Sequence, residues 1–149
     1  MNKELLISEI SKWSSDNSFF ITLNTMTKDK IKFDVQLRKL AHKLNDYCYG
    51  RSYERKEKQL KIIASIETGK LNGLLHAHLI VSFVDENRRS IQELNAYIRK
   101  HWYALIGLGD PFGSMVDVRV IGNLNERIKY LVKDTDYWLR NDVLNIVAL

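Results

Sequence analysis

The chain has 149 residues, of which 45% are hydrophobic and 28% charged, so we expect one globular domain spanning residues 1–149. A formal net charge of +5 suits a polyanionic partner but does not identify one. No apolar run approaches the ~18 residues of a membrane span. The first residues, MNKELLISEISKW, carry acids and no cleavage-like site, which argues against a secretory signal. The single cysteine, Cys48, excludes an internal disulfide framework and a multi-cysteine zinc site, so we expect a cytoplasmic protein with no membrane partner.

The first half of the chain alternates between helical and extended patterns. Residues 3–13 have apolar side chains at helical spacing, and FFITLNT (19–25) alternates as a strand does. Asp34 is a candidate N-cap for a helix that ends near Gly50. The pattern therefore predicts a helix, a strand and a second helix.

Two strands are predicted next, at 60–67 and 74–83. Ser90 and Glu93 form a capping-box pattern at the start of a further helix, and 115–121 alternates as a strand.

The last part of the chain is predicted to be helical. Asn123 and Glu126 resemble another capping pair, and the tail from Asp136 is assigned to a helix as well. The full order is then α-β-α-β-β-α-β-α. Hairpin-connected strands with helices in the long connections predict an α+β fold, with a ferredoxin-like or RRM-like antiparallel sheet and flanking helices.

The hairpin between 60–67 and 74–83 can be given a register from its turn. Asn72-Gly73 is the signal of a two-residue type I′ turn, which pairs Leu71 with Leu74. This register aligns one continuous apolar face along the hairpin, as expected where one side of a sheet packs on the core.

The other face of the same hairpin contains candidate metal ligands. The predicted register places Glu67 directly opposite His78, and His76 points to the same side because it is two residues away. Two imidazoles and a carboxylate suit a divalent metal, and three protein ligands leave positions open for phosphate or water. A polar sheet face with a paired histidine and carboxylate is the simpler alternative.

Three segments resemble the HUH endonucleases of rolling-circle replication initiators, relaxases and some transposases. HAHLIV (76–81) resembles the His-hydrophobic-His motif that names the family, FFITLNT resembles the first motif of the initiators, and YLVK (130–133) resembles the third motif, Tyr-x-x-Lys on a helix. The three occur in the family's order. The chain departs from many viral initiators in lacking a helicase domain, and from eukaryotic-virus initiators in lacking a proline at the end of the first motif.

The resemblance implies a role for each matching residue. Glu67, His76 and His78 would bind Mg²⁺ or Mn²⁺ on the open face of the sheet, although this ligand set also suits Zn²⁺ or Fe²⁺. Tyr130 would be the nucleophile that forms a 5′-phosphotyrosine intermediate with single-stranded DNA, and Lys133 would assist it.

The residues around Tyr130 agree with such a role. The apolar stripe of its predicted helix excludes Tyr130, which lies among Arg127 and Lys133. Lys133 is one turn away, so its ammonium could favour the phenolate or bind phosphate. Tyr137 would lie two turns on, and we interpret it as a packing or stacking residue with a second nucleophile as the alternative. Further candidate DNA contacts are Thr22, Asn24, Arg55, Lys58, Arg119 and Arg127.

The sequence therefore predicts a nicking and joining enzyme that initiates rolling-circle replication of a plasmid, phage or virus. Its partners would be an origin or hairpin in single-stranded DNA and host helicase and polymerase, and it would be a monomer or homodimer. One alternative is a single-tyrosine HUH transposase with the same chemistry. The other is a non-catalytic nucleic-acid-binding module on the same sheet fold.

Overall fold

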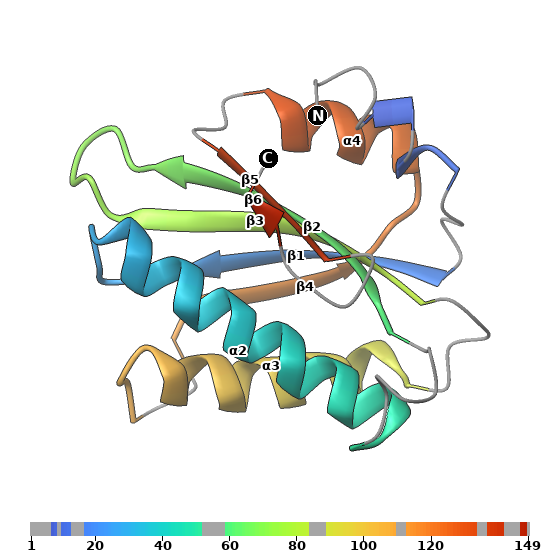
Figure 1. The fold of residues 1–149 in the computed structure, drawn as a ribbon, viewed down its shortest axis with the longest axis horizontal. Helices are drawn as coiled ribbons and strands as arrows, with labels where there is room; N and C mark the ends of the chain where they lie inside the picture. Colours follow the sequence, from blue (N-terminus) through green and yellow to red (C-terminus); the bar gives the residue numbers. More distant parts are fainter. Residues whose placement is uncertain are drawn as a thin grey trace.

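The computed structural model describes residues 7–8, 10–12, 17–51, 59–83, 89–109, 113–133, 137–141 and 147–148. Strands and helices alternate along the chain (Figure 1). In chain order they are β1 (Ser18–Asn24), α2 (Lys30–Tyr49), β2 (Lys61–Thr68), β3 (Leu75–Ser82), α3 (Ile91–Leu105), β4 (Val116–Val120), α4 (Leu124–Val132), β5 (Tyr137–Asn141) and β6 (Val147–Ala148).

The strands form one antiparallel sheet in the order β4-β1-β3-β2-β5-β6. The segment from β1 to β4 is a β-α-β-β-α-β unit whose strands lie in the order 4-1-3-2, which is the ferredoxin-like arrangement. The predicted α+β fold class is therefore confirmed. Strands β5 and β6 extend the sheet beyond β2.

One face of the sheet packs against α2 and α3 and forms the main core (Figure 1). Alternate residues of β1, β2, β3 and β4 point into this layer, as the period of two in a strand requires. Trp102 is completely buried there, and its indole N–H donates to the carbonyl of Asn24 at 2.9 Å. The strand residues buried in this layer are Phe19, Ile21, Leu23, Ile62, Ala64, Ile66, Leu75, Ala77, Leu79, Val81 and Val116.

The opposite face packs against α4, which lies on the other side of the sheet from α2 and α3 (Figure 1). This second layer is smaller, and Ile10 of the N-terminal segment contributes to it. Its buried members are Ile10, Phe20, Ile63, Ile80, Ile121, Leu124, Ile128 and Leu131.

The helix ends follow local capping rules, with one correction. Helix α2 is capped by Asp29 and not by Asp34: the Asp29 carboxylate accepts from the N–H groups of Ile31 and Lys32 at 3.0 and 3.2 Å. Asp34 lies a turn inside the helix, where it pairs with Arg38 at 3.0 Å. The ends predicted elsewhere are confirmed, namely Gly50 after α2, the capping box of Ser90 and Glu93 at α3, and Asn123 at α4.

The β2–β3 hairpin has a longer turn than predicted. Thr68 pairs with Leu75, and the Gly69 N–H donates to the Leu74 carbonyl at 2.8 Å, so residues 70–73 form a four-residue loop. The Asn72 side chain accepts from the Leu74 N–H at 3.0 Å and fills the space beside Gly69, where a Cβ atom would lie 2.5 Å from Asn72 Oδ1. Asn72 and Gly73 (φ 72°) are therefore the last two residues of the loop and not the whole turn.

This longer loop shifts the hairpin register by two residues. Glu67 pairs with His76, and Ser65 takes the predicted place of Glu67 opposite His78. The predicted register was wrong, but a shift of two leaves every side chain on its predicted face.

At the chain ends, one predicted helix is contradicted and the other is described only in part. The tail predicted to be helical from Asp136 contains strand β5 instead, which pairs with the outer edge of β2 and satisfies the backbone groups there. Within the predicted helix at 3–13, residues 7, 8 and 10 are helical, while Leu6 and Trp13 lie outside the described residues. Among the described helices, none is both long and apolar enough to cross a membrane.

Candidate metal centre

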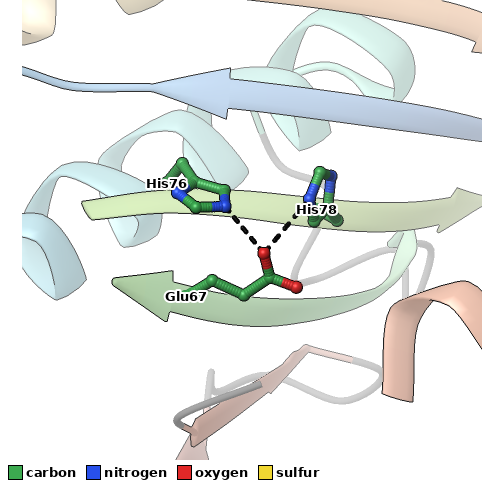
Figure 2. Close-up of side chains that lie close together, drawn as sticks. All are labelled: Glu67, His76 and His78. Carbon is green, nitrogen blue, oxygen red and sulfur yellow. Dashed lines mark hydrogen bonds and ion pairs between the residues drawn. The ribbon is translucent and has the colours of Figure 1, made fainter. Parts of the chain in front are cut away.

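The β2–β3 hairpin carries the three predicted metal ligands on the face that α4 partly covers. Glu67 lies on β2, and His76 and His78 lie on β3, all pointing to the same side (Figure 2). Each can offer one ligand atom, and these atoms all lie within 4.8 Å of one another. Among the residues that the structure describes, this is the group of His, Cys, Asp and Glu side chains that could hold a metal ion.

Both imidazoles point Nε2 at the same carboxylate oxygen. Glu67 Oε2 lies 2.7 Å from His76 Nε2 and 3.6 Å from His78 Nε2. Figure 2 marks both contacts with dashed lines. A carboxylate oxygen and two ring nitrogens that converge on one point are a suitable donor set for a divalent ion. The residues therefore fit a metal, with three protein ligands and room for further ligands.

His78 is the most buried of the three ligands, with 9% of its side chain exposed. Burial is the main cause of the lowered pKa of His78; the charge of Glu67 opposes this effect and the neighbouring His76 adds to it. A lowered pKa favours the neutral imidazole, which is the form that binds a metal.

Thr22 of β1 lies next to the other ring nitrogen of His78, Nδ1. It pairs with His78 in the β1–β3 register, and its hydroxyl lies 3.1 Å from His78 Nδ1. When Nε2 is a metal ligand, Nδ1 carries the proton and donates to Thr22 Oγ1, which fixes the ring orientation and the tautomer. Thr22 was predicted as a DNA contact, and in the structure its hydroxyl lies beside a metal-ligand candidate.

Helix α4 brings Tyr130 to the same place. Leu124, Ile128 and Leu131 bury one side of the helix against the sheet, whereas Tyr130 is half exposed. The ring centroid of Tyr130 lies 5.2 Å from that of His78 in an edge-to-face arrangement. The predicted nucleophile and the predicted metal ligands, which are more than 50 residues apart in the chain, are thus neighbours.

Phe20 and Arg127 lie close to the rings of His78 and Tyr130. The Phe20 ring stacks on the His78 ring at 5.7 Å and meets Tyr130 edge-to-face at 5.9 Å. The Arg127 guanidinium carbon lies 4.7 Å from the centroid of the Phe20 ring. Arg127, one of the predicted DNA contacts, therefore brings a positive charge next to this group of rings.

The remaining predicted site residues lie in different surroundings. Lys133 is exposed at the C-cap of α4, and its backbone N–H donates to the Tyr130 carbonyl at 3.4 Å. Asn24 pairs with His76 in the β1–β3 register, and its amide donates to the Ser114 carbonyl at 3.2 Å. Arg119 shares the face of the site but forms an exposed ion pair with Asp117 at 2.7 Å. Arg55 and Lys58 lie outside the described residues, as does the side chain of Tyr137.

Sequence reasoning missed Ser65, which lies opposite His78 on β2. It is fully buried, and its hydroxyl has no hydrogen-bond partner within the described part of the chain. The alternation of β2 predicts that Ser65 shares the face of Glu67, so the signal was present, but the shifted register hid its position beside His78.

Comparisons with models of known protein families, with curated proteins and with solved structures found no match for this chain.

Proposed function

We propose that the protein nicks and rejoins single-stranded DNA, with Tyr130 as the nucleophile and a divalent metal bound by Glu67, His76 and His78. The observation that carries the proposal is the position of Tyr130, whose ring centroid lies 5.2 Å from that of His78. Its phenol thus lies on the same face of the sheet as the three converging ligand candidates. The resemblance of the three sequence motifs to HUH endonucleases gives the reaction its class.

The reaction would be a transfer of one phosphodiester bond. Tyr130 Oη forms a bond to the scissile phosphorus, and the bond from phosphorus to the 3′ oxygen breaks. The phenolic proton passes to solvent, and the departing 3′ oxygen takes up one proton. The product is a 5′-phosphotyrosine with a free 3′ hydroxyl, and because one phosphate ester replaces another, the step can run backwards and rejoin the strand.

Each group near the site has a part in this step. Bound Mg²⁺ or Mn²⁺ would polarise the non-bridging phosphate oxygens and stabilise the charge of the transition state. Thr22 holds His78 in the orientation that presents Nε2. Arg127 and Lys133, one turn before and after Tyr130, supply positive charge for the phosphate or the phenolate.

The substrate and the biological role follow from the same chemistry. A phosphate must reach a site on the face of a sheet, which favours single-stranded or extruded DNA over a continuous duplex. A free 3′ hydroxyl can prime synthesis, so we propose initiation of rolling-circle replication in a cytoplasmic setting, together with host helicase and polymerase.

The test is a covalent adduct. The protein is incubated with Mn²⁺ and labelled single-stranded oligonucleotides that include hairpins, and adducts are separated on a denaturing gel. We expect an adduct with the wild type that disappears with chelator and in Tyr130→Phe. Tyr97→Phe is the matched control, because Tyr97 lies on α3 and donates its hydroxyl to the Lys43 carbonyl on the other side of the sheet.

Three other outcomes would contradict the proposal. An adduct that persists in Tyr130→Phe and disappears in Tyr137→Phe would move the nucleophile to β5. Metal-independent binding with no adduct on any substrate would indicate a non-catalytic nucleic-acid-binding module. Adduct formation only by a dimer that shares its sites between subunits would favour a transposase over a replication initiator.

A further inference from the structure

Exposed aliphatic side chains gather at the end of the sheet beyond Glu67 and His76. Leu71, in the loop between β2 and β3, is fully exposed. Met26 follows β1 and is 60% exposed, and Ile31 in the first turn of α2 is 80% exposed. These are three of the six large hydrophobic residues described as exposed, and they lie in only two short segments of chain.

The two segments lie against each other. The Leu75 N–H donates to the Thr27 carbonyl at 2.9 Å, and the Thr25 hydroxyl donates to the Leu75 carbonyl at 2.7 Å. The Lys28 side chain runs along the loop, with its Cε 3.5 Å from the position that a Cβ on Gly73 would occupy. In Figure 1 the β2–β3 loop and the start of α2 accordingly lie at the same end of the molecule. We call this region the hairpin tip, and it comprises residues 26–32 and 70–73.

The hairpin tip is strongly basic. It contains four lysines, Lys28, Lys30, Lys32 and Lys70, all of them exposed. Its one acidic residue is Asp29, whose carboxylate is engaged with the first N–H groups of α2. Positive charge around exposed apolar groups suits a partner that offers both phosphates and apolar surface, which is the description of a nucleic acid.

The kind of apolar residue indicates which form of nucleic acid fits. Single strands are held by aromatic rings on which successive bases stack. The hairpin tip has no aromatic exposed side chain among its described residues; its exposed apolar groups are Leu, Met and Ile. Aliphatic side chains such as Leu, Ile and Met insert between base steps of duplex DNA and partly unstack them.

We propose that the hairpin tip binds the end of a DNA duplex that adjoins the single strand at the metal centre. The proposal rests on the function proposed above. Leu71 packs on the last base pair, Met26 supports it, and Lys28 and Lys70 bind the phosphates of the stem. The β2–β3 hairpin leads from the tip to Glu67 and His76, so the protein selects a nick site at a junction between single- and double-stranded DNA.

The first experiment compares binding of two labelled DNAs by fluorescence anisotropy in the presence of chelator. One DNA is a hairpin with a single-stranded extension, and the other is the same extension alone. We expect Leu71→Ser to weaken binding of the junction about tenfold, a change of about 1.4 kcal/mol, and binding of the single strand much less. Val120→Ser is the matched control, because Val120 is 59% exposed and pairs with Phe19 at the far end of the sheet.

The second measurement is the salt dependence of junction binding. We expect Lys28→Ala and Lys70→Ala each to lower the slope of log Kd against log salt concentration by about 1. Lys100→Ala, on α3, is the control that should leave the slope unchanged.

The outcomes separate this proposal from the proposed chemistry. Equal weakening of both DNAs by Leu71→Ser, or no weakening of either, would overturn the role of the hairpin tip even if the Tyr130 adduct forms. If Leu71→Ser abolished binding to vesicles containing phosphatidylserine and left junction binding unchanged, the proposal would be overturned and the hairpin tip would be a membrane-binding surface. A selective loss of junction binding would support the hairpin tip even if no adduct is ever found.

Discussion

Leu79 and His78 are neighbours on β3 and are both buried, yet they belong to layers of different composition. Leu79 lies in the layer beneath α2 and α3, where every described buried strand residue is hydrophobic. Two polar side chains buried on that side, Gln36 and Asn45, belong to α2 and bond backbone groups. On the α4 side, the described residues include eight buried hydrophobic ones, together with buried or half-buried polar side chains such as His78, Ser65 and Glu67. One face of the sheet is thus built for folding stability, and the other holds polar groups that a purely structural face would not require.

The larger layer therefore supplies most of the free energy of folding, and the α4 side holds the candidate metal ligands. A substitution in the larger layer should change stability and leave metal binding in place, and a substitution of a ligand should do the reverse.

Leu79→Ala should lower the free energy of unfolding by about 2–5 kcal/mol, because it leaves a cavity in the larger layer. The folded protein should still bind Mn²⁺. Urea denaturation measures the first quantity and calorimetry the second. The control is Leu71→Ala, which removes the same atoms from a fully exposed site and should change stability by less than about 0.5 kcal/mol. Loss of metal binding in folded Leu79→Ala would show that the two faces are not separable.

His78→Ala should have the opposite result. It removes one of three candidate ligands, so we expect the affinity for Mn²⁺ to fall at least about 100-fold. The loss of stability should be smaller than for Leu79→Ala, since the larger layer is intact. Calorimetric titration with Mn²⁺ measures the affinity, and His42→Ala, on α2, is a matched control away from the site. Unchanged Mn²⁺ binding in His78→Ala would argue that the cluster is only a hydrogen-bonded polar face.

Thr22→Val should weaken Mn²⁺ binding by about tenfold, the lower end of the range for a residue that orients a ligand. The substitution keeps the shape of the side chain and removes the hydroxyl that lies 3.1 Å from His78 Nδ1. Thr22→Ser, which keeps the hydroxyl, should restore the affinity. Equal affinities for the valine and serine variants would mean that Thr22 does not orient His78.

Much of the fold could be predicted because its signals are local. Alternating apolar residues located β1 to β4 within one or two residues, and the capping pairs at Ser90 and Asn123 located the starts of α3 and α4. Strand β5 could not be predicted in this way, because it is stabilised by pairing with β2, with Ile66 opposite Tyr137 about 70 residues later in the chain. Its local sequence fits a helix as well as a strand.

The site was predictable in its membership but not in its contacts. Glu67, His76 and His78 are assigned to one face by side-chain alternation alone. The error of two residues in the register therefore left the predicted set of metal ligands unchanged. The bond between Thr22 and His78 depends on which strand lies beside β3, and hairpin reasoning contains no information about β1.

The start of α2 was predicted at the wrong aspartate, because Asp29 and Asp34 differ little in what they contribute to helix stability. The two residues also allow a test of where this helix of the larger layer begins. Asp29 accepts two backbone N–H groups, whereas Asp34 forms an i, i+4 ion pair with Arg38. Asp29→Ala should therefore lower the free energy of unfolding by about 1 kcal/mol, and Asp34→Ala by only about 0.3–0.5 kcal/mol. Urea denaturation at low and high salt separates the two, because salt screens the exposed pair more than the cap bonds. A larger loss in Asp34→Ala than in Asp29→Ala would mean that α2 begins later than the structure has it, and that the helical layer beneath the sheet is shorter by a turn.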